Sequence, residues 1–163
     1  MSVNHLELID RAPAKFPGRL SAATWPSRSR ILMAAAVIAW TIPLLVLGVM
    51  VVHTPWKRTV THLYHDASAN WWGERDLYSG PGGMNYLPHF ALAFAPFHEL
   101  PVPLGDVLWR CGAAALLAGG LWRIARQQPG IAAPHAFLIA TLLALPLSMQ
   151  SLRNGQANAV FAG

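Results

Sequence analysis

The residues with the most evident chemical potential form one cluster between two apolar stretches. A carboxylate in this cluster, Asp66 first and Asp76 or Glu74 as alternatives, could act as a general base for an acceptor hydroxyl. Ordinary solvated loop charges are the competing interpretation. A metal site is a further alternative, because i and i+3 positions share a helix face. The cluster comprises His62, His65, Asp66, Glu74, Arg75 and Asp76.

A second polar group follows the last long apolar stretch. Arg153, Asn154, Gly155 and Gln156 offer guanidinium and amide donors that suit a phosphate or sugar hydroxyls. A plain helix end with Gly155 after its last turn has the same sequence. Ligand binding and helix termination both remain open for this group.

The elements that must position these residues are apolar helices. The chain of 163 residues is 54% hydrophobic and only 12% charged, which predicts an integral membrane protein. The runs 31–52, 107–124 and 131–149 each approach the roughly 20 residues that cross a bilayer. The fold class expected is all-α, a polytopic transmembrane helical protein.

The first apolar run separates a basic tail from the rest of the chain. Residues 1–30 are expected to form a cytoplasmic tail, because basic residues concentrate on the cytoplasmic side. An uncleaved anchor is favoured over a signal peptide, whose apolar core is shorter. Residues 31–163 then form one transmembrane domain with an extracytoplasmic loop at about 53–86 that contains a short amphipathic helix. The formal charge of +5 is explained by topology, and no nucleic acid partner is expected.

The stretch 87–100 decides the topology. It is only about 14 residues long and contains Pro88 and Pro96, so it is marginal as a span. We favour an arrangement in which it does not span, so that residues 153–156 return to the same side as Asp66. Arg110, inside the next apolar run, is expected to snorkel or to pair with Asp106 at i,i+4. Small residues from Ala113 to Gly120 are expected to permit close helix contact.

Five motifs occur in a recognisable order along the chain. They are Tyr64-x-x-Ala67, the run 73–78, the run 85–88 with Pro96, Leu108-Trp109, and the run 154–158. Their order resembles the N-terminal part of glycosyltransferase family 87, over roughly residues 31–163. The resemblance implies a GT-C type enzyme of the cell membrane, a hexosyltransferase or mannosyltransferase that moves a sugar from a polyprenyl-phosphate donor to an extracytoplasmic sugar or lipid acceptor.

The resemblance also assigns roles to residues. The family pattern usually has a catalytic aspartate four residues before the tyrosine matched to Tyr64, and this chain has Val60 there. Asp66 then becomes the candidate base, and no metal or cofactor is expected. The residues expected to bind substrate are Tyr64, Tyr86, Pro88, Arg153, Asn154, Gly155 and Gln156.

Family members are longer, so we expect this chain to be truncated at its C-terminus. The alternative function is a non-catalytic membrane subunit or a lipid-binding membrane protein. A small transporter is a third possibility, although the apolar spans carry no acidic residue of the kind that couples ions.

Overall fold

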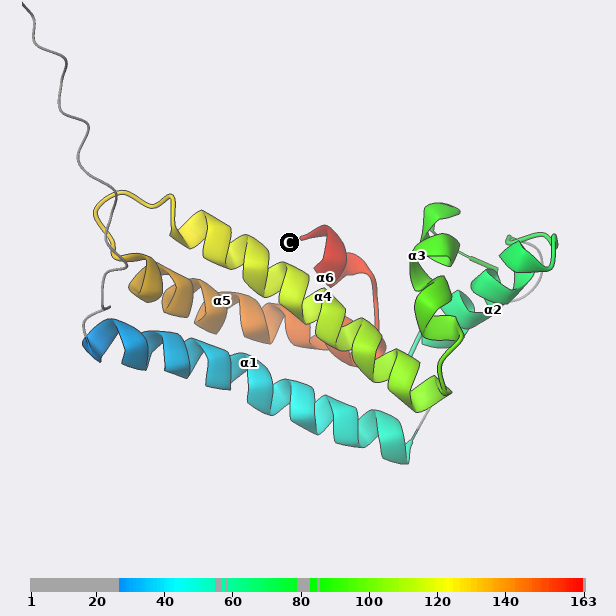
Figure 1. Ribbon diagram of the computed structural model, residues 1–163, viewed down its shortest axis with the longest axis horizontal. Helices are drawn as coiled ribbons and strands as arrows, with labels where there is room; N and C mark the ends of the chain where they lie inside the picture. The colour runs from blue at the N-terminus through cyan, green and yellow to red at the C-terminus, as the bar shows by residue number, and fades with distance from the viewer. Residues whose placement is uncertain (1–26, 55–56, 58, 79–82, 85, 163) are drawn as a thin grey trace, which may run out of the picture.

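The computed structural model describes residues 27–54, 57, 59–78, 83–84 and 86–162. In this part of the chain there are helices and no strands, which confirms the all-α prediction. The basic tail expected at 1–30 lies almost entirely outside the described residues. The helices are α1 (Ser27–His53), α2 (Thr61–Trp72), α3 (His89–His98), α4 (Val102–Ala125), α5 (Ala133–Asn154) and α6 (Asn158–Phe161) (Figure 1).

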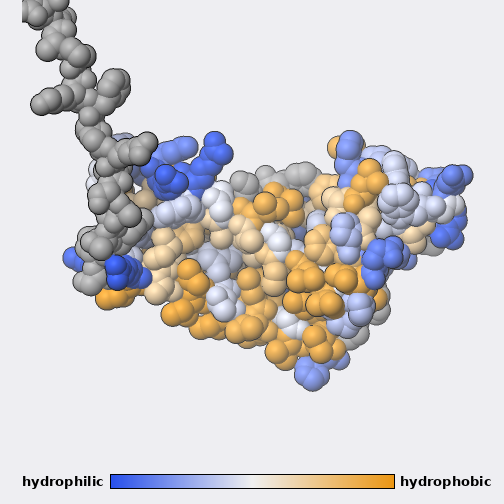
Figure 2. All heavy atoms as spheres, in the orientation of Figure 1, coloured by the Kyte–Doolittle hydropathy of each residue, from blue (hydrophilic) through white to orange (hydrophobic). Residues whose placement is uncertain are grey.

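Three of the helices in the described part are long and apolar enough to cross a membrane: Arg28–His53, Val102–Ala125 and Ala133–Asn154. They correspond to the three predicted runs. The marginal stretch 87–100 instead forms α3, whose 10 residues are too few to span a bilayer. Many large apolar side chains on the three long helices are exposed, Leu147 at 84% among them. Figure 2 shows these apolar surfaces along the bundle, as expected of helices that face lipid.

The long helices lie side by side, and the shorter α2 and α3 gather at one end (Figure 1). At that end α1 and α5 finish and α4 begins. The peptide N–H of Val60 donates to the carbonyl of Asn154 at 2.9 Å, so residues just before α2 contact the end of α5. The end of α5 and the start of α2 are therefore neighbours, and the side of the membrane on which they lie stays a prediction.

The bundle core contains small and large side chains packed between α1, α4 and α5. Trp40 from α1 packs there with Ala113, Ala114 and Leu117 of α4. The Trp40 indole N–H donates to Thr141 Oγ1 at 3.3 Å, which satisfies both polar groups in an apolar setting. Close helix contact in α4 thus comes from alanines, whereas the exposed Gly119 has open space where a Cβ would lie.

The amphipathic helix expected in the 53–86 segment is α2, which packs mainly against α3. Between them and the start of α4 lies an aromatic core. Tyr64 packs against Phe94 and Trp109, with ring centroids 5.5 and 5.8 Å away. This aromatic core holds α2 and α3 against the N-terminal part of α4.

Candidate functional site

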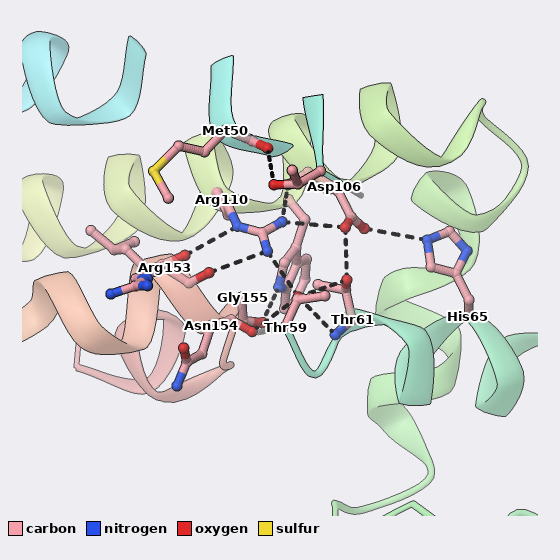
Figure 3. A network of polar contacts seen from close by, with 12 residues as sticks. Met50, Thr59, Thr61, His65, Asp106, Arg110, Arg153, Asn154 and Gly155 are labelled. Carbon is pink, nitrogen blue, oxygen red and sulfur yellow. Dashed lines mark hydrogen bonds and ion pairs between the residues drawn. The ribbon is translucent and has the colours of Figure 1, made fainter. Parts of the chain in front are cut away.

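The side chain of Arg110 joins three segments at that end of the bundle. It is 3% exposed and lies two turns into α4. Nε donates to the carbonyl of Leu152 at 3.1 Å, and Nη2 donates to the carbonyl of Arg153 at 3.4 Å (Figure 3). The last carbonyls of a helix have no partner inside it and carry partial negative charge. Arg110 therefore stabilises the end of α5.

Arg110 also pairs with Asp106, one turn earlier on α4. Nη1 lies 3.5 Å from Asp106 Oδ2 and donates to the Asp106 carbonyl at 2.9 Å. Asp106 is 1% exposed, and its Oδ2 accepts a hydrogen bond from Thr61 Oγ1 at 2.7 Å. A buried charge is tolerated when it is paired and hydrogen-bonded, and both conditions hold here.

A chain of two imidazoles continues from Asp106 toward α3. His65 Nε2 lies 3.4 Å from Asp106 Oδ1, and His65 Nδ1 lies 3.2 Å from His98 Nδ1. His65 is buried, and its ring meets that of Phe94 edge-on at 4.8 Å. His98 is half-buried at the end of α3. The chain therefore leads from the buried ion pair toward the surface.

Gly155 ends α5 in the left-handed conformation, with φ of 68°. Its N–H donates to the carbonyl of Leu152, and the N–H of Gln156 donates to that of Ser151, which is the hydrogen-bond pattern of a glycine-terminated helix. The Trp109 indole N–H donates to the Gly155 carbonyl at 2.9 Å. The backbone of the terminal polar group therefore serves helix termination, and its side chains are left to contact other groups.

A cavity of about 420 Å³ opens beside this network, between the ends of α1 and α5 and the start of α4. We name it the cationic cavity, because Lys57, Arg110 and Arg153 line it and, among the described residues that line it, Asp106 is the single carboxylate. Leu47, Val49, Met50 and Val51 of α1 form its apolar side. A charged group with an attached apolar chain suits such a lining.

An apolar groove of about 500 Å³ adjoins the cationic cavity and shares Val49 and His53 with it. We name it the lipid groove. Leu44, Leu45 and Val52 of α1 line it together with Val107 of α4. The groove lies between α1 and α4, and both helices are long and apolar enough to span a membrane.

The predicted substrate-binding residues are divided between this region and the aromatic core. Arg153 lines the cationic cavity, and Asn154 lines a neighbouring cleft with Gln150. The side chain of Gln156 accepts hydrogen bonds from Ser151 Oγ and Asn158 Nδ2, both at 3.4 Å. Of this terminal group, Arg153 therefore has the side chain best placed for an anion.

Tyr64, Tyr86 and Pro88 lie near α2 and α3 instead. Tyr64 is 1% exposed, and its hydroxyl oxygen accepts the N–H of Ala157 at 3.3 Å. Burial raises the pKa of Tyr64 well above its usual range, and the Tyr86 phenol adds to this shift. Pro88 precedes the first residue of α3. These contacts are those of packing residues, and a substrate-binding role for them stays a prediction.

The three candidate bases are exposed. Asp66 lies on the outer face of α2, and Glu74 and Asp76 lie in the segment after it. None of the three lines the cationic cavity. The metal alternative gains no support, since no group of three metal-binding side chains occurs in the described part of the chain. His65 points to Asp106, whereas Asp66 is exposed on the same helix.

Sequence reasoning did not assign the polar centre of the site. It identified the Asp106–Arg110 pair at i,i+4, but only as a local contact where the apolar run begins. Of the two expectations for Arg110, snorkelling or pairing with Asp106, the structure has the pairing, and both side chains are buried. Thr59 and Thr61 flank Val60, at which the resemblance implies an aspartate, and both contact the pair. An ion pair inside an otherwise apolar helix is the signal that would have found this centre.

Comparison with known proteins supports the family indicated by the motifs. Residues 85–163 match the family model described as glycosyltransferase family 87. No curated protein matches the chain, and no solved structure matches it. The matched range includes α3 to α6 and the Asp106–Arg110 pair, and begins after the Tyr64 motif and the run 73–78. The chain is therefore similar to glycosyltransferase family 87 over residues 85–163, which supports a membrane glycosyltransferase in general terms.

Proposed function

We propose that this chain acts in a membrane hexosyltransferase of the mannosyl type, which takes its sugar from a polyprenyl-phosphate donor and passes it to an extracytoplasmic sugar or lipid acceptor. The observation that carries the proposal is the junction of the cationic cavity with the lipid groove through Val49 and His53. A phosphate in the cavity and an apolar chain in the groove match this pair of linings. The site belongs to the cell membrane, with the N-terminus in the cytoplasm.

The cations have different parts in donor binding. Arg110 already donates hydrogen bonds to several acceptors of the protein. Its contribution to phosphate binding is therefore mainly its positive charge, held in one position. Among the described lysines and arginines that line the cavity, Arg153 and Lys57 are left to contact a phosphate. A guanidinium can make two parallel hydrogen bonds to phosphate oxygens, which gives Arg153 the larger share of affinity.

The proposed reaction is attack of an acceptor hydroxyl on the anomeric carbon of the donor. The bond between that carbon and the phosphate oxygen breaks, and its electron pair leaves with the lipid phosphate. The hydroxyl proton passes to a carboxylate. Cations around the leaving phosphate stabilise the charge that develops on it.

Asp66 is the proposed base, with Asp76 and Glu74 as alternatives. Asp106 lines the cavity, but it is 1% exposed and Arg110, Thr61 and His65 already contact its oxygens, so an acceptor hydroxyl has little access to it. Asp66 is exposed and free of such a buried ion pair.

The test is sugar transfer in vesicles that contain the protein. Transfer from a radiolabelled polyprenyl-phosphate hexose is measured for the wild type and for Asp66→Asn, Asp76→Asn and Glu74→Gln. A general base contributes about 10²–10⁴-fold, so Asp66→Asn should lower transfer by that range while the other two variants keep it. Full transfer by Asp66→Asn would remove Asp66 as the base, and loss in another variant would assign the role there.

The second candidate function is a non-catalytic membrane subunit or lipid-binding protein. Two observations favour it: Val60 occupies the position of the family aspartate, and Asp66 does not line the cationic cavity. Binding of a polyprenyl-phosphate lipid with no transfer by the wild type, and copurification with one stable partner, would select this function.

A further inference from the structure

The contact between His65 and His98 restricts how protons are distributed over the pair. The two Nδ1 atoms are 3.2 Å apart, and one must donate while the other accepts. His65 Nε2 faces a carboxylate oxygen of Asp106, which can only accept from it. In the neutral pair, His65 therefore carries its hydrogen on Nε2 and accepts at Nδ1, and His98 donates from Nδ1.

This assignment leaves Nε2 of His98 without a hydrogen. His98 is half-buried, so a proton from water can reach it at the end of α3. Once that nitrogen is protonated, His98 can pass its Nδ1 hydrogen to His65. The contacts of His65 with His98 and with Asp106 then still pair one donor with one acceptor. A second added proton would place hydrogens on both Nδ1 atoms and oppose two donors. The pair therefore accepts one extra proton and not two.

The extra charge would arrive beside the cationic cavity. Asp106 lines that cavity, and its two oxygens are divided between Arg110 on one side and His65 on the other. A positive His65 shares in neutralising Asp106, which leaves more of the Arg110 charge uncompensated. The net charge around the cavity rises by one, and an anion there is held more strongly.

We propose that His98, His65 and Asp106 form a one-proton relay that sets the charge of the cationic cavity, so that a phosphate ligand binds more tightly when the relay is protonated. The inference deepens the proposed function, since it rests on the cavity's binding a lipid phosphate. His65 and His98 are positioning residues in it, acting on the ligand through Asp106 and Arg110. By thermodynamic reciprocity, the bound anion also favours protonation of the pair.

Other titratable and charged groups lie near the relay and have to be separated from it. Asp106 and Arg110 on α4 are part of the arrangement. Glu99 follows His98 and is exposed, and Asp66 and His62 lie on the exposed side of α2. His53 lines the cavity itself and is a titratable group of its own.

The test measures binding of farnesyl methyl phosphate to the protein in nanodiscs at about pH 7.5 and about pH 5.5, the range over which histidine changes charge. This ligand is a phosphodiester whose own charge stays fixed there. The variants are His98→Gln and His65→Gln, with His53→Gln for the cavity histidine. His135→Gln is the matched control, because His135 lies in the first turn of α5, at the other end of that helix.

The wild type and His135→Gln should bind farnesyl methyl phosphate at least about three times more tightly at the lower pH, as one added charge at short range implies. In His98→Gln and His65→Gln this difference should fall to the part that His53 alone contributes. An undiminished pH effect in His98→Gln would overturn the relay, as would an effect lost only in His53→Gln.

Nitrogen-15 spectra of the histidine rings in the wild type test the relay without any ligand and without a variant that fails to fold. Uptake of a single proton shared by His65 and His98 is expected. Independent protonation of each ring, or of neither, would contradict it. Absence of ligand binding at both pH values would defeat the proposed function, while these spectra would still decide the relay.

Discussion

The guanidinium of Arg110 lies directly against the backbone of Gly155. A Cβ built on Gly155 would lie 3.1 Å from Arg110 Nη2 and 2.5 Å from Thr61 Cγ2. The left-handed φ of 68° also disfavours any side chain at this position. The end of α5, the start of α2 and the ion pair of α4 are thus fitted together at one residue.

Gly155→Ala should therefore destabilise the protein by about 2–4 kcal/mol, through backbone strain and displacement of Thr61 or Arg110. Thermal unfolding in detergent measures this. Gly112→Ala is the control, since nothing lies within 4 Å of a Cβ there and alanine favours a helix interior. Equal stability of the two variants would show that the fit at Gly155 is loose.

Removal of one partner of the buried ion pair should be costly. Arg110→Met leaves Asp106 without its cation and the end of α5 without a donor, and we expect a loss of about 3–5 kcal/mol. The double variant with Asp106→Asn should recover part of this loss, because no buried charge remains. Unfolding in mixed detergent measures the cycle, and simple additivity of the two substitutions would contradict the coupling.

Tyr64 should ionise only well above the usual tyrosine pKa near 10. Its folded pKa is raised by burial, so stability from its neutral phenol is present below the unfolded value near 10 and is lost as pH rises further. A phenolate absorbance titration should show a late step that coincides with unfolding. Tyr64→Phe should lack that step, whereas Tyr78→Phe, at an exposed position, should retain it. A late step that persists in Tyr64→Phe would refute this assignment.

The proposed topology of three spans with a cytoplasmic N-terminus would place the turn between α4 and α5 inside the cell and the segment after α2 outside it. Single cysteines at Asp76 and at Gln128, both exposed, test this in a Cys111→Ala background. A membrane-impermeable maleimide should label the first in intact cells and the second only after permeabilisation. Labelling of both from outside would contradict the three-span arrangement, and a reversed pattern would invert the orientation.

The membrane helices were predictable because crossing a bilayer requires about 20 apolar residues, a strong and local signal. The boundaries were less predictable. We expected a span at 107–124, whereas α4 begins at Val102 and follows Pro101. The earlier start moves Asp106 from a position just before the helix to one inside it, which explains why its burial was not expected.

The site was predictable only in part. Arg153 follows a long apolar run and lines the cationic cavity, and an anion-binding role for it stays a prediction. The contact of His65 with His98 joins residues 33 positions apart, and that of Thr61 with Asp106 joins residues 45 apart. No periodicity in the sequence encodes such pairs, because they depend on how α2 and α3 pack against α4.

Binding of a prenyl phosphodiester to the cationic cavity tests the central claim most directly. Affinity for farnesyl methyl phosphate in nanodiscs is compared for the wild type, Arg153→Gln, and Arg126→Gln, whose exposed arginine lies at the far end of α4. Loss of a charge-assisted pair should weaken binding by about tenfold in Arg153→Gln alone. Unchanged affinity in Arg153→Gln, or equal weakening in both variants, would contradict a lipid-phosphate site in this cavity.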